Sequence, residues 1–415
     1  MPALGLISRP YRRSRQFLFL CSVVAAGCGQ AGVGAVPGTA DSNGSLALGA
    51  AQHSQVPMGR KQRSVETCPT IYNFLGYPDG SIPQAGLVDR SGTLYGTTST
   101  GGTSSLGTVY SMTPGGSEHV LHSFAGTPDG STPGAGMLDV KGTLYGTTYY
   151  GGANGVGAVF KIDKSGTLSI VYSFKSTPDG AEPDAALIYA GGLLYGTTRI
   201  GGTTGNGTVF SVTTSGAENV LYSFANGSDG ASPVASLAQL SGAFYGTTQS
   251  GGTSGYGTVF KITPSGVEKV LHSFAGGSDG AIPLGGLVAV GKALYGTTAT
   301  NGGSVANGTV FKITPAGRET VLHNFGASGD GKYPNAGLID VGGTLYGTTA
   351  EGGIVGIGTV FSITTSGAES PLCSWPSITN GEEPLASVVY LNGTLYGTTQ
   401  GGGSASQGTV FAVPL

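Results

Sequence analysis

The sequence repeats one unit of about 50 residues seven times, and this periodicity constrains the fold more than any other feature. Each unit contains Leu-Tyr-Gly-Thr-Thr or a close variant, and the copies begin at Leu94, Leu144, Leu194, Phe244, Leu294, Leu345 and Leu395. An Asp-Gly pair keeps the same register at Asp79, Asp129, Asp179, Asp229, Asp279 and Asp330, with Asn380 in the seventh place. Repeats of this length are typical of solenoids and propellers.

Each unit contains four strand-like runs. In the unit after Asp129 they cover residues 135–140, 143–148, 158–162 and 168–174. These runs are rich in β-branched and aromatic residues and are bounded by glycine, proline or serine. Four short strands in each unit predict an all-β fold, a seven-bladed β-propeller of four-stranded antiparallel blades. An open β-solenoid is the alternative.

The phase of the repeat favours a closed ring. The array begins with a fourth-strand segment at residues 70–74 and ends with a third strand at residues 408–415. The N-terminal strand can therefore complete the last blade and close the ring without an open sheet edge. We accordingly predict a single propeller domain over residues 68–415.

The first 28 residues are predicted to be an export signal. Four arginines, at positions 9, 12, 13 and 15, precede an apolar run over residues 17–27 that is too short to span a bilayer. The run ends in a lipobox-like Ala-Ala-Gly-Cys, which makes Cys28 the expected lipid anchor; an ordinary secretion signal is the alternative. Residues 29–67 are expected to form a flexible linker. The expected location is the bacterial outer membrane or cell surface as a lipoprotein, and otherwise the periplasm or the medium.

Two cysteines remain after the signal, Cys68 and Cys373. They lie four positions out of step in equivalent strands, which corresponds to about 13 Å along a strand. That distance exceeds the reach of a disulfide, so we expect these cysteines to stay unpaired.

The charge balance limits the partners of the chain. With 19 Lys and Arg against 22 Asp and Glu, the net charge is −3. No basic surplus is available to neutralise phosphates, so nucleic acid is not an expected partner. Membrane contact is expected only through the lipid anchor, and the protein is expected to be a monomer.

The repeat unit resembles a known family. The run from Leu144-Tyr-Gly-Thr-Thr through Gly151-Gly152 to Gly157-Ala-Val-Phe160 is similar to the bacterial GloVer tandem repeat, over about residues 68–415. The resemblance implies an exported, propeller-like surface protein with a variable (choice-of-anchor) attachment. It implies no defined reaction.

The titratable residues in fixed repeat positions have structural interpretations. The Asp-Gly aspartates are predicted to cap turns, in which Gly130 would supply a positive φ. His122, His272 and His323 share a fourth-strand position in different blades and cannot converge on one ion. Five glutamates share a turn position and are expected to be solvated: Glu118, Glu218, Glu268, Glu319 and Glu369. The sequence therefore assigns no catalytic residue, no metal ligand and no cofactor.

A weaker hypothesis concerns the innermost strands. Asp89, Asp139 and Asp340 share a position near the end of that strand and could lie at a channel mouth. Paired acids there would suit a propeller hydrolase or lyase that acts on polysaccharide.

The long loops vary between copies, whereas the strands repeat. Loops on a rigid scaffold often carry binding residues. The candidate ligand-binding side chains in these loops are Tyr149, Tyr150, Arg199, Gln249, Tyr256 and Glu351. The predicted function is non-catalytic binding or scaffolding for a glycan or protein ligand. Neutral variation on a purely structural surface protein is the remaining alternative.

Overall fold

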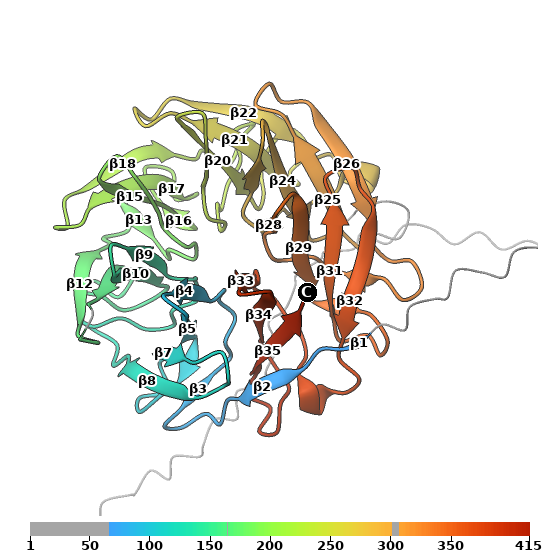
Figure 1. Ribbon diagram of the computed structural model, residues 1–415. Helices are drawn as coiled ribbons and strands as arrows, with labels where there is room; N and C mark the ends of the chain where they lie inside the picture. Colours follow the sequence, from blue (N-terminus) through green and yellow to red (C-terminus); the bar gives the residue numbers. More distant parts are fainter. Residues whose placement is uncertain (1–65, 164, 301–306) are drawn as a thin grey trace, which may run out of the picture. The chain divides into compact units, whose positions relative to one another are not determined.

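The computed structural model describes residues 66–163, 165–300 and 307–415. Within them the chain forms a seven-bladed β-propeller, as the repeat predicts (Figure 1). Each blade is a four-stranded antiparallel sheet, and the described residues contain no α-helix. No helix among them is long and apolar enough to cross a membrane. Cys28 and most of the predicted linker lie outside the described residues.

The strands occupy the same four positions in every blade. The first strands are β4 (Val88–Arg90), β9 (Leu138–Val140), β14 (Ile188–Ala190), β19 (Ala238–Leu240), β23 (Val288–Val290), β28 (Ile339–Val341) and β33 (Val389–Leu391). The second strands are β5 (Thr93–Thr98), β10 (Thr143–Thr148), β15 (Leu193–Thr198), β20 (Ala243–Thr248), β24 (Ala293–Thr298), β29 (Thr344–Thr349) and β34 (Thr394–Thr399).

The outer half of each blade is built in the same way. The third strands are β7 (Thr108–Met112), β11 (Ala158–Ile162), β17 (Thr208–Thr213), β21 (Thr258–Ile262), β25 (Thr309–Ile313), β31 (Thr359–Thr364) and β35 (Thr409–Pro414). The fourth strands are β8 (Glu118–Ser123), β12 (Leu168–Ser173), β18 (Glu218–Ser223), β22 (Glu268–Ser273), β26 (Glu319–Asn324), β32 (Glu369–Ser374) and, in blade 7, β2 (Thr70–Asn73). The first strands are shorter than the sequence predicts, because they begin several residues after the preceding proline.

Short elements occupy the connections. Three pairs of two-residue strands join loops: β3 (Gly80–Ser81) with β6 (Thr100–Gly101), β13 (Gly180–Ala181) with β16 (Ile200–Gly201), and β27 (Gly331–Lys332) with β30 (Glu351–Gly352). Among the described residues, the 3₁₀ turns η1 (Gly277–Asp279) and η3 (Ile378–Asn380) lie between blades.

The N-terminal strand closes the ring, as predicted. Strand β2 pairs antiparallel with β35, so the first and last strands of the propeller belong to the same blade (Figure 1). Backbone and side-chain hydrogen bonds then join blade 7 to blade 1, from Ile82 N to Gln407 O at 2.9 Å and from Thr398 Oγ1 to Ala85 O at 3.2 Å. Both faces of blade 7 are therefore covered, one by blade 6 and the other by blade 1.

The hydrophobic core is divided into clusters between neighbouring blades. Between blades 2 and 3, for example, Val159 and Phe174 pack against Leu194 and Phe210, and all four are fully buried. Phe174 and Phe210 meet edge to face with ring centroids 5.0 Å apart. Burying a side chain of this size contributes about 1.5–3 kcal/mol, so each interface is a substantial source of stability.

The glycine of the second strand serves the blade itself. Gly146 pairs with Phe160 of the third strand, and a Cβ at Gly146 would come within 2.5 Å of the Phe160 ring. The glycine thus leaves space for an aromatic ring on the neighbouring strand of the same sheet.

The prediction that Cys68 and Cys373 stay unpaired is wrong. They form a disulfide with a Cα–Cα distance of 5.0 Å, and both are buried. The segment before β2 includes the short strand β1 (Glu66–Thr67), which pairs in parallel with β32 on the outer edge of blade 6. The prediction compared the positions of the two cysteines along equivalent strands. The two residues instead face one another across the interface of neighbouring blades, so an offset along the strand does not set the distance between them.

Candidate functional site

The two long loops of each unit meet on one side of the ring. The loop that precedes the first strand contacts the loop between the second and third strands, both in its own blade and in the preceding one. Thr132 N donates to Leu106 O of blade 1 at 2.8 Å, and Tyr149 N of blade 2 donates to Thr132 O at 3.1 Å. This backbone pairing holds the variable side chains of the loops on a rigid base.

A polar cluster joins the loops of blades 2 and 3 on this side. The Tyr149 hydroxyl donates to the Glu182 carboxylate and accepts from Arg199 Nη1 at 2.5 Å. Arg199 Nη1 also lies 3.8 Å from Glu182 Oε2. Burial and the bond to Glu182 raise the pKa of Tyr149, so its hydroxyl remains protonated at neutral pH.

Two further residues lie close to this cluster. Burial raises the pKa of Asp184 to about 6, although the attraction of Arg199 opposes the shift. A Cβ at Gly134 would lie 2.9 Å from Asp184 Oδ1 and 3.0 Å from Gln84 Nε2, so these side chains converge over the bare backbone of Gly134. Carboxylate, guanidinium and phenol groups are therefore available together in these loops.

Tyr150 adds an exposed aromatic ring. The residue is 47% exposed, and its ring meets Tyr149 edge to face with centroids 4.6 Å apart. Its backbone both donates to and accepts from Ser131, which fixes its position. We call Tyr149, Tyr150, Glu182, Asp184 and Arg199 the loop cluster.

The remaining sequence candidates lie in other loops. Tyr256, 40% exposed, accepts a backbone hydrogen bond from Ile282 N, and Gln249 N donates to Ser232 O. Glu351 is exposed in β30. Among the residues that the structure describes, none of the three has a hydrogen bond or ion pair to the loop cluster.

Sequence reasoning missed Glu182 and Asp184. Both flank Pro183, at positions where the seven copies carry different residues, for example Glu182, Ser232 and Tyr333. This variation between copies, on either side of a proline that recurs in every copy, is the sequence feature that could have identified both residues. The segment was interpreted instead as the end of the Asp-Gly turn.

The acids of the innermost strands cap turns. Asp139 Oδ1 accepts from Gly142 N at 2.7 Å, and Asp340 Oδ1 accepts from Gly343 N at 3.0 Å. Asp340 also lines a cavity of about 730 Å³ among the first strands, together with Tyr390. Their hydrogen bonds give these carboxylates a role in hairpin geometry.

The Asp-Gly aspartates cap turns, as predicted. Asp79 Oδ2 accepts from Leu75 N at 2.9 Å, and its other oxygen accepts from Gly80 N at 2.6 Å. The glycine of this pair has a positive φ in only four copies, Gly130, Gly230, Gly280 and Gly381. In all copies the residue two positions later, such as Ile82 or Thr132, adopts the left-handed region.

The same aspartates also bond to the fourth strand. The tyrosine or histidine seven residues earlier reaches the carboxylate in every copy that has an aspartate, as in Tyr172 to Asp179 at 2.8 Å and His272 to Asp279 at 3.0 Å. Tyrosine and histidine can therefore occupy the same repeat position, because both side chains reach the aspartate carboxylate.

The five glutamates are not solvated turn residues, which corrects the prediction. Each lies partly buried against the Asp-Gly turn of the preceding blade, and burial together with the charge of the facing aspartate raises the pKa of Glu118, Glu218, Glu268, Glu319 and Glu369 to about 7. We call them the interface glutamates. The sequence did not reveal that these glutamates lie near the aspartates, because the two residues of each pair belong to different repeat units.

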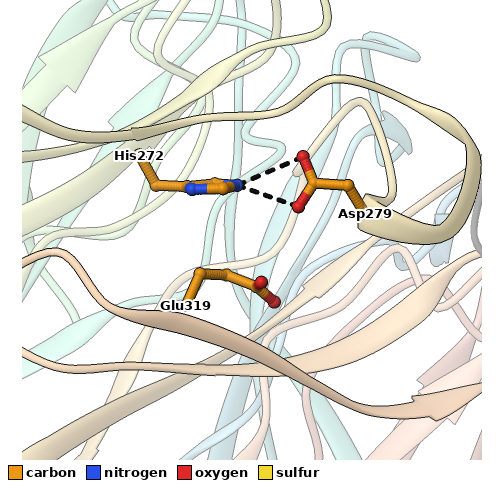
Figure 2. A group of neighbouring side chains, drawn as sticks. All are labelled: His272, Asp279 and Glu319. Atoms are coloured by element: carbon orange, nitrogen blue, oxygen red, sulfur yellow. Dashed lines mark hydrogen bonds and ion pairs between the residues drawn. The ribbon is translucent and has the colours of Figure 1, made fainter.

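The interfaces differ in which groups meet. Tyrosine, aspartate and glutamate meet at three interfaces (Tyr72, Asp79 and Glu118; Tyr172, Asp179 and Glu218; Tyr222, Asp229 and Glu268). Histidine replaces tyrosine between blades 4 and 5 and between blades 5 and 6 (Figure 2). At the interface of blades 1 and 2, Leu168 stands in the position of the glutamate.

Comparisons with known proteins place the repeat in a family. The model of the Gloeobacter/Verrucomicrobia repeat matches residues 29–254 and 235–415. A search of curated proteins finds no match.

Similar solved structures share little sequence with this chain. A gluconolactonase from Xanthomonas campestris is 14% identical with a TM-score of 0.41, covering 84% of this chain and 95% of its own. The structure of YjhT is 10% identical with a TM-score of 0.42, covering 73% and 99%. A putative TolB from Agrobacterium tumefaciens is 11% identical with a TM-score of 0.40, covering 72% and 94%. We draw no functional conclusion from them.

Proposed function

The chain belongs to the Gloeobacter/Verrucomicrobia repeat family, and from this premise we propose that it is an exported, non-catalytic binding module for a glycan or protein ligand. The loop cluster between blades 2 and 3 is the proposed binding surface. The observation that carries the proposal is the exposed Tyr150 ring, held in place beside an ion pair of Arg199 and Glu182. Binding sites commonly combine aromatic surface with a few well-placed polar groups.

The loop cluster has the chemistry that a glycan requires. The ring face of Tyr150 can pack against the apolar C–H face of a sugar. Arg199 can donate to hydroxyl groups, and the carboxylates of Glu182 and Asp184 can accept from them. A polar loop of a protein partner would use the same groups.

The disulfide between Cys68 and Cys373 supports export. Disulfides form and persist in oxidising compartments outside the cytosol. Lipid attachment at Cys28 completes this proposal, with the outer membrane or cell surface as the location. Mass spectrometry of the mature N-terminus should find diacylglycerol on Cys28, and an unmodified N-terminus at another residue would refute the anchor.

The binding proposal is tested with the full chain on a glycan and protein array, followed by titration of the ligands found. We expect Tyr150→Ala and Arg199→Ala each to weaken binding about tenfold, the equivalent of about 1.4 kcal/mol. Tyr189→Ala is the matched control, because Tyr189 is also exposed but belongs to the inner strand β14. Unchanged binding in the triple variant of Tyr149, Tyr150 and Tyr256 to alanine would remove this surface from consideration.

The enzymatic alternative gives a distinct result in the same assays. A propeller hydrolase or lyase would turn over a polysaccharide, and Asp139→Asn with Asp340→Asn would abolish that turnover. Because both carboxylates cap hairpins, we expect these variants to change stability and leave ligand binding intact.

A further inference from the structure

We propose that the interfaces between blades 4 and 5 and between blades 5 and 6 each bind one divalent transition-metal ion, with zinc as the reference ion. The first site consists of His272 and Asp279 from blade 4 and Glu319 from blade 5 (Figure 2). The second consists of His323, Asp330 and Glu369. Both sites lie at blade interfaces and are independent of the loop cluster.

The geometry brings three ligand atoms together at each site. One nitrogen or oxygen from each residue lies within 4.8 Å of the others. In the first site, His272 Nε2 lies 3.0 and 3.2 Å from the two oxygens of Asp279, and the Glu319 carboxylate lies beside this pair (Figure 2). In the second, His323 Nε2 lies 3.1 Å from Asp330 Oδ2.

The donor set fits a borderline metal ion. Imidazole nitrogen and carboxylate oxygen are common ligands of zinc and of the neighbouring divalent ions. A small adjustment of each side chain toward the centre of the triangle would place the donors at about 2.0–2.2 Å from an ion. Three protein ligands leave a further position for water.

At the first site, Glu319 Oε1 is buried and has no hydrogen-bond partner among the described residues. The equivalent oxygens of Glu118, Glu218 and Glu268 at the tyrosine interfaces are unpartnered in the same way, so the histidine in place of tyrosine is what distinguishes the proposed sites. Glu319 faces Asp279 across the interface, so two carboxyl groups meet beside the imidazole of His272 (Figure 2). A bound cation would take the free oxygen of Glu319 as a ligand.

The disulfide shows that side chains at these repeat positions can bond across an interface. Cys373 stands where the other fourth strands have histidine or tyrosine, and Cys68 stands where they have glutamate or Leu168. Their Cα atoms are 5.0 Å apart. The interface of blades 6 and 7 is therefore linked covalently at the place where the two preceding interfaces would be linked by metal.

The tyrosine interfaces are internal controls. Tyr222 donates to Asp229 at 3.0 Å, and Glu268 of the next blade completes the same triangle. A phenol that remains protonated donates a hydrogen bond and is a poor metal ligand. A His→Tyr variant therefore keeps the structural contact and removes the metal ligand, while Tyr222→His should create a third site.

The test is calorimetric titration of the metal-free full chain with zinc chloride. We expect the wild type to bind two more equivalents than His272→Tyr/His323→Tyr, and each single variant to lose one. His122→Tyr is the matched control, because Leu168 leaves that interface with only two ligands, and it should lose none. Tyr222→His should gain one equivalent.

Other metal-binding groups of the chain contribute equally to every variant, so only differences in stoichiometry count. Zinc should also raise the unfolding temperature of the wild type above that of the double variant. Equal stoichiometry in the wild type and the double variant would overturn the proposal. A loss in His122→Tyr equal to that in His272→Tyr would overturn it as well, because it would show that the complete triangle is not required.

Discussion

The threonine after the glycine of each second strand joins neighbouring blades. Its hydroxyl donates to the carbonyl of an alanine in the next blade, as in Thr147 to Ala185 at 3.3 Å and Thr297 to Ala336 at 2.8 Å. Thr247 differs, because its buried hydroxyl has no partner among the described residues. Gly285 stands there in place of the alanine. The same residue type is therefore bonded at one interface and unbonded at another.

This difference predicts opposite effects of one substitution. Thr147→Val leaves the Ala185 carbonyl without its donor, and we expect a loss of about 1–2 kcal/mol in the free energy of unfolding. Thr247→Val removes a hydroxyl that has no partner, so we expect no loss or a gain. Urea denaturation of both variants measures the difference. Equal destabilisation would show that the hydroxyl bond contributes nothing.

The second-strand glycine gives another prediction at the residue scale. A Cβ at Gly146 would lie 2.5 Å from the Phe160 ring, so Gly146→Ala forces the ring to move. Such overpacking costs about 1–3 kcal/mol. Gly115→Ala is the control, because the nearest atom to its new Cβ would be Thr113 Oγ1 at 3.9 Å. Thermal unfolding that ranks the two variants in the reverse order would contradict this assignment.

At the scale of the elements, the fourth strands β8, β18, β22, β26 and β32 each carry a glutamate into the interface with the preceding blade. Glu218 lies against Tyr172 and Asp179, and the three line a cavity of about 690 Å³. Burial and the charge of Asp179 raise the pKa of Glu218 to about 7, although the bond with Tyr172 and the charge of Lys175 act in the opposite direction. The blade interface is therefore sensitive to protons near neutral pH.

We predict that the protein loses stability as the pH rises through 7. A glutamate with a pKa of about 7 in the folded state and 4.5 as a model value binds more protons when folded. Its contribution is complete below pH 4.5 and disappears above pH 7. With allowance for solvent screening it is on the order of 1 kcal/mol for Glu218.

Denaturant unfolding between pH 5.5 and 8 measures this dependence. Glu218→Gln should make the decline shallower and raise the stability at pH 8, because the neutral amide needs no proton. Glu351→Gln is the control, since Glu351 is exposed, and it should leave the slope unchanged. A steeper decline in Glu218→Gln would mean that the charged form is the one stabilised by folding.

The sequence predicted what lies within a blade better than what lies between blades. The runs at 143–148 and 158–162 match β10 and β11 residue for residue, because alternating side chains and turn residues are local signals. The interface glutamates and the disulfide were missed. Their contacts depend on how neighbouring sheets are staggered, which follows from twist and packing and is absent from the repeat pattern of one unit. The loop cluster was half predicted, with Tyr149, Tyr150 and Arg199 found and Glu182 and Asp184 overlooked.

At the scale of the whole molecule, the ring depends on its N-terminal segment. Strand β1 extends blade 6 and β2 completes blade 7, so residues 66–73 connect the beginning of the propeller to its last two blades. Cys68 lies between these two strands, and its disulfide with Cys373 of β32 spans 305 residues. Closure therefore combines strand pairing with a covalent bond at the point where a propeller would otherwise open.

We predict that the variant Cys68→Ser/Cys373→Ser folds but is less stable by about 2–5 kcal/mol, because its unfolded chain is no longer restrained by a long closed loop. Thermal unfolding under non-reducing conditions gives the comparison. Reductant should lower the stability of the wild type to that of the variant and leave the variant unchanged.

The loss of stability in this variant should also differ between blades around the ring. In the variant, only hydrogen bonds and packing hold the N-terminal segment, so hydrogen exchange should accelerate in β1, β2 and β35 before it does so in β11 and β12 of blade 2. Uniform acceleration in all blades would show that the disulfide acts on the unfolded chain alone. Acceleration confined to β1, β2 and β35 would identify the contact of blades 6 and 7 as the place where the propeller opens first, and would explain why the cross-link occurs there.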